Sequence, residues 1–458
     1  MIKTAPMPFD QRQTASRLSD ELTVPWLQWL GFTLMHVPLA FMMDRWPGIA
    51  TIHAVFTLIL GVWFLVRDQS PLRVLYVCGY IVGAEVLWRM TDAGVNWEYG
   101  KYTIAFLSLL AVLRWKGRLS TWPILYLLFM SPSVVIPFLE LPWPLARRAV
   151  SFNLSASLAL TLFLLFAGNV RLHISQFCSL LQALISPIVG IASLALRTLV
   201  THSQIRFTNE SNWLASGGYG PNQVSAILGL GALAGWIIFL LLSQHNRRLG
   251  AVYVVMMFWF VSHALLTFSR GGVVNFAAGV LVSLAYLGRK HFKLLLIAVV
   301  LLLAFLTIVF PILNQFTGGM LETRLRDLDP TGRDVYIRMD MELWKSNPLF
   351  GVGAGMAPLY RAGYLGIDVA THTEYTRLLA EHGLLGLGAL AILAILLWRA
   401  YRQASSPLGP MLVLTFVAWC VVEMGHSATR IVAIPFCIGL ALLSSRIAIV
   451  APGESHPA

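Results

Sequence analysis

One uninterrupted apolar run constrains this chain more than any other feature. Residues 293–313 read KLLLIAVVLLLAFLTIVFPIL and carry a single charge, at their first position. A helix of about 20 apolar residues crosses the hydrocarbon core of a bilayer, and there its backbone polar groups must be satisfied internally. Comparable runs recur along the chain. The sequence therefore predicts an all-α polytopic membrane protein.

The composition supports the same class. Charged residues make up 12% of the chain and apolar residues 57%, whereas soluble proteins carry about 25% charged residues. We count fourteen apolar segments near spanning length. The segment 102–114 is short, and the segment 174–200 is compatible with a partly interfacial position. We therefore expect 12–14 transmembrane helices.

These segments divide the chain into five parts. We expect a cytoplasmic N-terminal tail without a cleavable signal, a transmembrane region of about eleven segments, one long periplasmic loop that contains short amphipathic helices, a C-terminal transmembrane region and a cytoplasmic tail. Their boundaries are 1–25, 26–313, 314–378, 379–450 and 451–458.

Basic loops orient the chain. RDQSPLR, RWKGR, QHNRR and GRKHFK fall on one side if the N-terminus is cytoplasmic, as the positive-inside rule requires. Both termini then lie in the cytoplasm, and the polar clusters at 201–223, 269–272, 314–378 and 423–430 lie outside. The net charge of +12 is not gathered into a run dense enough to predict nucleic-acid binding.

No metal or cofactor site is predicted. The four cysteines fall inside apolar segments without CxxC spacing, which is typical of small core residues. His372 and His382 are ten residues apart and belong to no HExxH motif. We therefore expect a protein that works without a metal.

Arg270 stands in TFSRGG, between two strongly apolar segments. An arginine at an outer membrane boundary opposes the positive-inside preference, so it is a candidate for binding phosphate or carboxylate. The alternative is an arginine that snorkels and anchors a helix end. Gly271 and Gly272 would let a ligand approach the backbone closely.

A second outer loop ends in GGYGPNQ, where Pro221 occupies the first turn of a helix. Arg206, Asn222 and Gln223 are candidates for holding a glycan or pyrophosphate there. Ordinary loop capping explains the two amides equally well.

The long loop contains an amphipathic helix, predicted over 332–346. Thr331 and Asp334 have capping-box spacing, and Asn347-Pro348 ends the run. Arg333 and Arg338 are both candidates for pyrophosphate binding, but they point in different directions on a regular helix. The alternative is an exposed face with Arg–Asp pairs. The following GVGAG is interpreted as a flexible elbow.

THTEYTRLLAEHGLLG begins at Thr371 and leads into the next apolar run. Thr371 and Glu374 fit a capping box, which puts His372 in the first turn of a helix that ends near Gly383. The positive end of the helix dipole keeps such a histidine neutral, as a general base requires. The alternative is a polar loop residue. His382, in the last turn, is interpreted as a cation that stabilises the helix end.

The SRGG hairpin, TGRDVYIRMDMELWKSNPLFGVGAG and HTEYTRLLAEHGLLGLG together resemble the O-antigen ligase and polymerase superfamily, over roughly residues 201–400. The resemblance implies a GT-C-like glycosyltransferase of the bacterial inner membrane. It would transfer a glycan from undecaprenyl pyrophosphate to an acceptor, lipid A-core for a ligase or another repeat unit for a polymerase.

The resemblance also implies site residues. His372 corresponds to the catalytic histidine of the family's loop, Arg270 to the arginine of the outer hairpin and Arg333 to that of the loop helix. The family usually has a small amide after the histidine, where this chain has Thr373.

Three functions remain in competition. We favour a ligase-like transferase over a repeat-unit polymerase of the same superfamily, because one compact loop with one histidine resembles the ligase branch. A lipid-linked glycan flippase is the alternative from another class, although no internal repeat typical of transporters is present. A membrane scaffold would leave the outer arginines unexplained.

Overall fold

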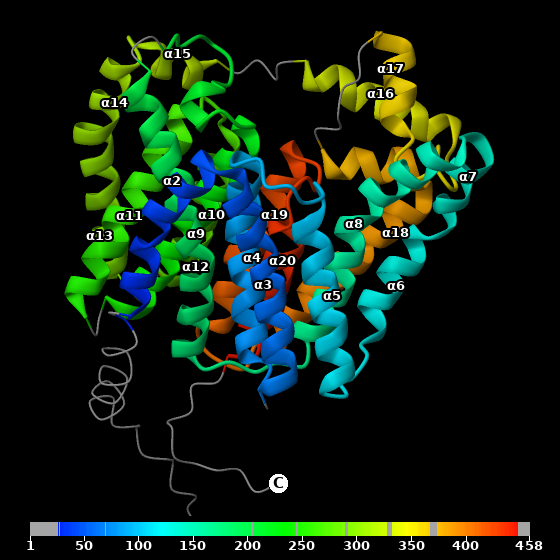
Figure 1. Ribbon diagram of the computed structural model, residues 1–458, viewed down its shortest axis with the longest axis horizontal. Helices are drawn as coiled ribbons and strands as arrows, with labels where there is room; N and C mark the ends of the chain where they lie inside the picture. The colour runs from blue at the N-terminus through cyan, green and yellow to red at the C-terminus, as the bar shows by residue number, and fades with distance from the viewer. Residues whose placement is uncertain are drawn as a thin grey trace, which may run out of the picture.

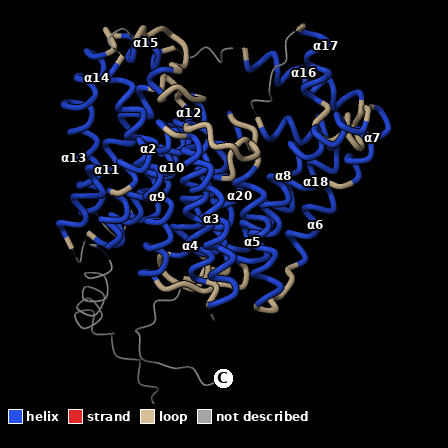
Figure 2. The backbone as a smooth tube through the Cα atoms, in the orientation of Figure 1, coloured by secondary structure: helices blue, strands red, loops and turns tan. Residues whose placement is uncertain are grey.

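The computed structural model describes residues 26, 28–68, 70–202, 205–243, 246–288, 292–327, 332–366 and 373–447. Within these ranges the chain is helical and contains no strand, and short loops join most of the helices (Figure 2). This confirms the predicted all-α class.

Nine segments of the described chain are long and apolar enough to cross a membrane. They are α3 (Pro47–Arg67), the α6–α7 segment (Thr121–Glu140), α8 (Trp143–Ala167), α9 (Ile174–Thr201), α10 (Pro221–Leu242), α11 (Arg247–Leu266), the α13–α14 segment (Phe292–Phe316), α18 (Glu374–Arg402) and α19 (Gly409–His426).

Further helices run beside these segments in Figure 1. They are α2 (His36–Arg45), α4 (Leu72–Met90), α5 (Tyr99–Arg114), α12 (Gly271–Leu287) and α20 (Ala433–Ser444). The number of 12–14 spans, like the orientation in the membrane, stays a prediction.

Two helices form the centre of the bundle. In the most apolar stretch of each helix, 89% of the residues of α9 and 94% of those of α10 are buried. In the α13–α14 segment only 11% are buried, and this segment lies at the edge of the bundle. Small residues bring α10 and α12 together. A Cβ on Gly229 would lie 2.1 Å from the carbonyl oxygen of Gly272, so only glycine allows this approach. The predicted SRGG hairpin is thus fixed to the central helix.

One end of the bundle carries three short helices, which we call the α15–α17 face (Figure 1). They are α15 (Met320–Arg326), α16 (Arg333–Ser346) and α17 (Ala357–Leu365). The bounds of α16 agree with the predicted helix 332–346 to one residue. Pro221 occupies the first turn of α10, also as predicted.

α18 is kinked at Gly383, whose φ of 61° and ψ of −141° are not helical. The kink leaves carbonyl groups of the preceding turn without helical partners. The amides of Val352 and Gly353 donate to the carbonyls of Ala380 and Glu381 at 2.8 and 3.2 Å. We call residues 348–353 the strap.

The strap is not the predicted flexible elbow. A Cβ on Gly351, which has a φ of +70°, would lie 2.4 Å from the carbonyl carbon of Glu381. The glycines of GVGAG therefore allow close packing of two backbones. The predicted helix end near Gly383 is likewise a kink within a longer helix.

Candidate functional site

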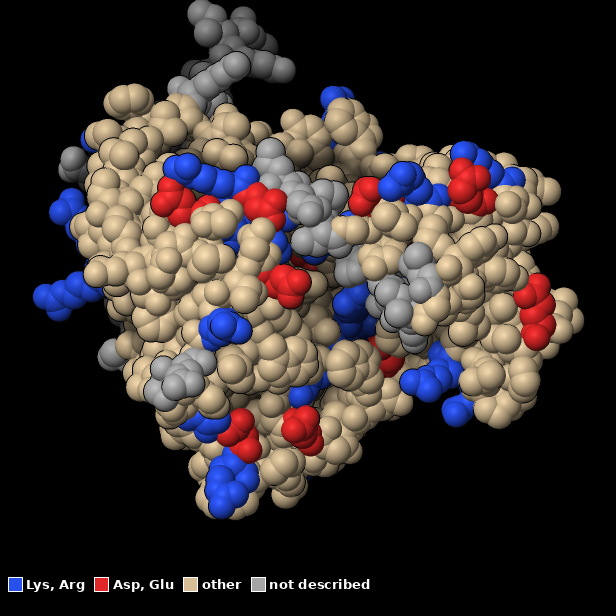
Figure 3. Space-filling model, turned by 90° about the horizontal axis from the view of Figure 1, so that it is seen from above, with Lys and Arg blue, Asp and Glu red and all other residues tan. Residues whose placement is uncertain are grey.

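Four arginines from four segments gather at the α15–α17 face, and we call them the arginine cluster. Arg270 precedes α12, Arg324 lies on α15, Arg333 begins α16 and Arg430 lies between α19 and α20. The charge of Arg333 interacts with the charges of the other three. Figure 3 looks down on this face and shows basic side chains in the hollow between its two halves.

Arg270 and Arg324 tie α15 to the SRGG hairpin. Arg270 donates to the carbonyl oxygen of Asp327. The buried Arg324 donates from Nε to the carbonyl of Phe268 at 3.1 Å and from Nη1 to that of Asn209 at 2.7 Å. These contacts hold both guanidinium groups in fixed positions at the base of the cluster.

Arg333 differs from the other three arginines. Its side chain is half-buried, and no hydrogen-bond or ion-pair partner of its guanidinium lies among the described residues. Burial lowers the pKa of Arg333, and the neighbouring charges of Arg270 and Arg324 lower it further. A partly desolvated cation among like charges is stabilised by a bound anion.

Arg338 lies apart from this cluster, in agreement with the predicted divergence of the two arginines. Its side chain is exposed and pairs with Asp334 of the same helix at 2.8 Å. An exposed pair of this kind contributes at most about 1 kcal/mol.

Sequence reasoning did not single out Arg430. The end of α4 holds its backbone, because Arg89 donates to the carbonyl of Arg430 at 3.1 Å and Glu85 accepts from the amide of Val432 at 2.7 Å. Burial lowers the pKa of Arg430, as does the charge of Arg333, and Glu423 opposes both. The signal was available, because Arg430 stands between two apolar segments as Arg270 does.

A buried carboxylate and a histidine of α19 border the cluster. Asn275 of α12 donates from its amide nitrogen to Glu423, so its oxygen faces His426 Nε2 at 2.9 Å. This arrangement assigns the ring proton to Nε2 of His426. The charge of Arg333 acts on both Glu423 and His426.

The glycines of SRGG serve these contacts and not the approach of a ligand, contrary to the prediction. A Cβ on Gly271 would lie 2.5 Å from Cε1 of His426, and a Cβ on Gly272 would lie 1.8 Å from the carbonyl oxygen of Ser225. Both glycines are therefore needed for helix packing.

The structure places Arg206 on a segment that packs against the hairpin, and within the described ranges no hydrogen bond or ion pair joins its side chain to the cluster. Phe207 stacks on Phe268 with ring centroids 5.1 Å apart, while the side chain of Arg206 is exposed. The side-chain oxygens of Asn222 and Gln223 accept from Ser269 at 2.8 Å and from Arg89 at 2.7 Å, so both residues join α10 to neighbouring segments and neither caps the helix.

His372 lies outside the described residues, and the described chain resumes at Thr373. α18 begins at Glu374 with Thr373 at its N-cap, so the predicted helix start that put His372 in the first turn is wrong. The carboxylate of Glu374 accepts from the amide of Thr429 at 3.1 Å. Because Thr429 precedes Arg430, the start of α18 is joined to the arginine cluster.

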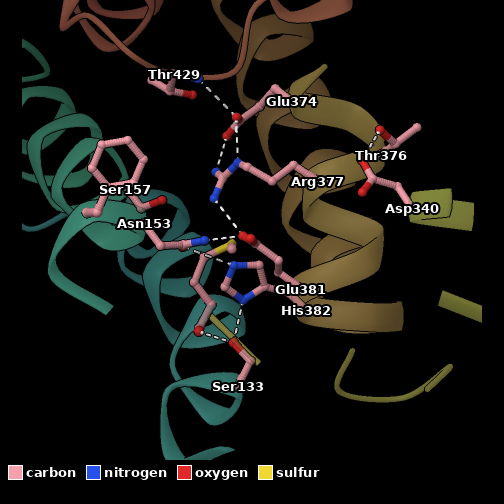
Figure 4. A network of polar contacts seen from close by, with 12 residues as sticks. Ser133, Asn153, Ser157, Asp340, Glu374, Thr376, Arg377, Glu381, His382 and Thr429 are labelled. Atoms are coloured by element: carbon pink, nitrogen blue, oxygen red, sulfur yellow. Dashed lines mark hydrogen bonds and ion pairs between the residues drawn. The ribbon is translucent and has the colours of Figure 1, made fainter. Parts of the chain in front are cut away.

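The first half of α18 contains a buried polar network (Figure 4). Arg377 lies between two carboxylates, with Nε 2.9 Å from Glu374 and Nη1 3.0 Å from Glu381. Asn153 of α8 donates to Glu381. We call Asn153, Glu374, Arg377, Glu381 and His382 the α18 network.

The prediction that His382 stabilises a helix end as a cation is wrong, because α18 continues past it to Arg402. It is fully buried, with Nδ1 in contact with Ser133 and Nε2 3.3 Å from the amide oxygen of Asn153. Glu381 is buried beside it. Both residues therefore hold α18 against α8 and the α6–α7 segment.

No group of three or more His, Cys, Asp or Glu residues within the described ranges has the arrangement of a metal site. The four cysteines are buried free thiols, as predicted. Among the described residues, the α15–α17 face offers guanidinium groups that can bind anions, beside a carboxylate and a histidine.

The fold and the cluster define a helical membrane protein with a positively charged site at one end of its bundle. Residues 257–391 match the Wzy_C family model, described as O-antigen ligase. The match extends from α11 into α18 and confirms the resemblance to the O-antigen ligase family. The family implies a ligase- or polymerase-type enzyme with lipid-linked glycan substrates. No curated protein matches the chain.

Proposed function

We propose that this protein is an inverting, metal-independent glycosyltransferase of the O-antigen ligase type. It transfers a glycan from undecaprenyl pyrophosphate to a hydroxyl of lipid A-core on the periplasmic face of a bacterial inner membrane. The observation that carries the proposal is the arginine cluster, in which a half-buried Arg333 lies among like charges without a protein partner in the described chain.

The cluster suits a pyrophosphate leaving group. The bond from the anomeric carbon to the pyrophosphate oxygen breaks, and the electron pair leaves with that oxygen. Guanidinium groups placed beforehand stabilise such developing charge without a divalent ion. We assign this role to Arg270 and Arg333, supported by Arg324 and Arg430. Arg206, on the exposed neighbouring segment, would contact the donor at the rim, whereas Arg338 receives no role.

We assign the acceptor step to His372. As the acceptor oxygen forms its bond to the anomeric carbon, the hydroxyl proton passes to the imidazole. Direct displacement of this kind inverts the anomeric centre. The hydrogen bond between Glu374 and Thr429 supports the assignment, because it holds the start of α18 beside the segment of Arg430.

Reconstitution tests the proposal. Purified protein in liposomes is given undecaprenyl-pyrophosphate glycan with or without lipid A-core, in the presence of EDTA. We expect glycan to appear on lipid A-core, and His372→Ala to abolish this while the protein stays folded. Loss of transfer in EDTA, or near wild-type activity of His372→Ala, would contradict the mechanism.

The same assay separates the alternatives. Growth of a glycan ladder without lipid A-core would identify a repeat-unit polymerase of the same superfamily. Movement of labelled lipid-linked glycan across the liposome membrane, without a new glycosidic bond, would identify a flippase. The gathering of Arg270, Arg324, Arg333 and Arg430 at one end of the bundle favours chemistry at that face, because a flippase needs charged groups along a path through the bilayer.

A further inference from the structure

A second basic site lies at the end of the bundle opposite the α15–α17 face. A cavity of about 1150 Å³ opens there, among the α5–α6 and α8–α9 connections and the lower ends of α18 and α20 in Figure 1. Ligand pockets commonly measure roughly 300–1,000 Å³. The cavity is therefore large enough for more than a single small ion.

Four arginines from four segments line this cavity, and no carboxylate of the described residues does. They are Arg118, Arg171, Arg399 and Arg446. None forms a side-chain hydrogen bond or ion pair with the described part of the chain, and only Arg399 has an aromatic neighbour, Trp122, at 5.6 Å. The cavity thus concentrates positive charge without internal compensation.

The walls hold these arginines in fixed places. Asn169, at the end of α8, accepts from the amide of Arg118 at 2.7 Å and donates to its carbonyl at 3.0 Å. The amide of Ser405 donates to the carbonyl of Ser445 at 3.0 Å, which joins the α18–α19 connection to the segment of Arg446. Desolvation lowers the pKa of Arg446, and the charge of Arg171 lowers it further.

The remaining lining combines polar side chains with an apolar part that belongs to the bundle itself. The apolar part includes Leu164, Leu396, Leu442 and Trp122. A site lined by both guanidinium groups and hydrocarbon side chains matches an amphiphile with an anionic head. A soluble anion would use only the first half of this lining.

We propose that this cavity binds the phosphate head group of an anionic phospholipid in the membrane leaflet opposite the arginine cluster. Basic pockets between transmembrane helices are typical sites for such head groups, including the two phosphates of cardiolipin. The site is separate from the proposed catalytic site, so a failure of one proposal leaves the other standing.

The test is native mass spectrometry of the full-length protein, titrated with cardiolipin, phosphatidylglycerol or zwitterionic phosphatidylcholine. Arg171→Gln combined with Arg446→Gln removes two cavity charges, and we expect affinity for the anionic lipids to fall about tenfold or more. Lysine at both positions should restore most of the binding, because lysine keeps the charge. Phosphatidylcholine should bind weakly to every variant.

The matched control removes two arginines from the same end of the bundle but outside the cavity, Arg114→Gln with Arg248→Gln. We expect it to bind cardiolipin within about twofold of the wild type, since it leaves the cavity charges in place. Equal loss in both double variants, or equal binding of phosphatidylcholine, would overturn the proposal. Displacement of bound lipid by inorganic phosphate at millimolar concentration would identify a free-anion site instead.

Discussion

Two groups of charged residues, the α18 network and the arginine cluster, are neighbours in the fold, and their arginines have opposite surroundings. In the α18 network, Arg377 is shared by two carboxylates within 3.0 Å. In the arginine cluster, three guanidinium groups surround that of Arg333, which has no hydrogen-bond or ion-pair partner in the described chain. A single hydrogen bond, from Thr429 to Glu374, joins the two sets. The comparison teaches that the surrounding charge, and not the residue type, separates an arginine that stabilises the fold from one that awaits a ligand.

Arg377→Ala should break the comparison on its structural side and have the largest effect. It leaves Glu374 and Glu381 buried without a cation, and removing one partner of a buried pair costs about 3–5 kcal/mol. We expect a marked loss of folded protein, measured as yield and as thermal midpoint by size-exclusion chromatography. Arg338→Ala, which removes an exposed arginine, should stay near the wild-type midpoint; an equal midpoint for both variants would contradict the prediction.

Arg333→Ala should break the comparison on its functional side. Removing a charge that stabilises a leaving group costs about 100-fold or more in rate. The thermal midpoint should stay the same or rise, because repulsion from Arg270 and Arg324 is relieved. Glycan transfer by Arg338→Ala, measured in parallel on the same helix, serves as the control. Reduced stability together with retained transfer would place Arg333 with Arg377 instead.

Arg270→Lys sharpens the comparison by keeping the charge and removing the planar fork. We expect transfer to fall about tenfold or more, because an ammonium cannot bind the pyrophosphate in a bidentate manner. The control is Arg326→Lys on α15, whose exposed side chain pairs with Glu322 at 2.5 Å. If both lysine variants transfer glycan at the wild-type rate, charge alone suffices at Arg270.

Glu85→Gln should have the smallest effect, through the position of Arg430. The change weakens the contact with Arg89 and with the amide of Val432, and so loosens the segment that carries Arg430. We expect KM for the lipid-linked donor to rise several-fold, about the loss of one charged hydrogen bond, with kcat less affected. A fall in kcat alone, with KM unchanged, would point to a role in the chemical step.

Sequence patterns predicted what depends on neighbours in the chain. The apolar runs predicted helices, and Asn347-Pro348 predicted the end of α16 to the residue. The divergence of Arg333 and Arg338 followed from helical period alone. Each of these features is set within one turn or one apolar run, so no knowledge of distant residues was needed.

The same patterns failed where distant segments meet. Gly271 was predicted to let a ligand approach and Gly351 to belong to a flexible elbow. In the structure, Gly271 packs against His426 and Gly351 against the carbonyl carbon of Glu381. His382 read as a helix-end cation because its contacts, Ser133 and Asn153, lie far away in sequence. Arg324 and Arg430 were missed as cluster members because their proximity to Arg333 arises only in the folded bundle.

The strap at the kink of α18 has a mechanical consequence. Its amides bind the carbonyls of Ala380 and Glu381, and the amide of Leu384, just past the kink, donates to the carbonyl of Pro348 at 2.8 Å. Hydrogen bonds therefore join the strap to α18 on both sides of the kink. α16 cannot swing outward alone to admit a bulky glycan, because its far end must carry the first half of α18 with it. An opening of this face would therefore move α16, which carries Arg333, together with the first half of α18.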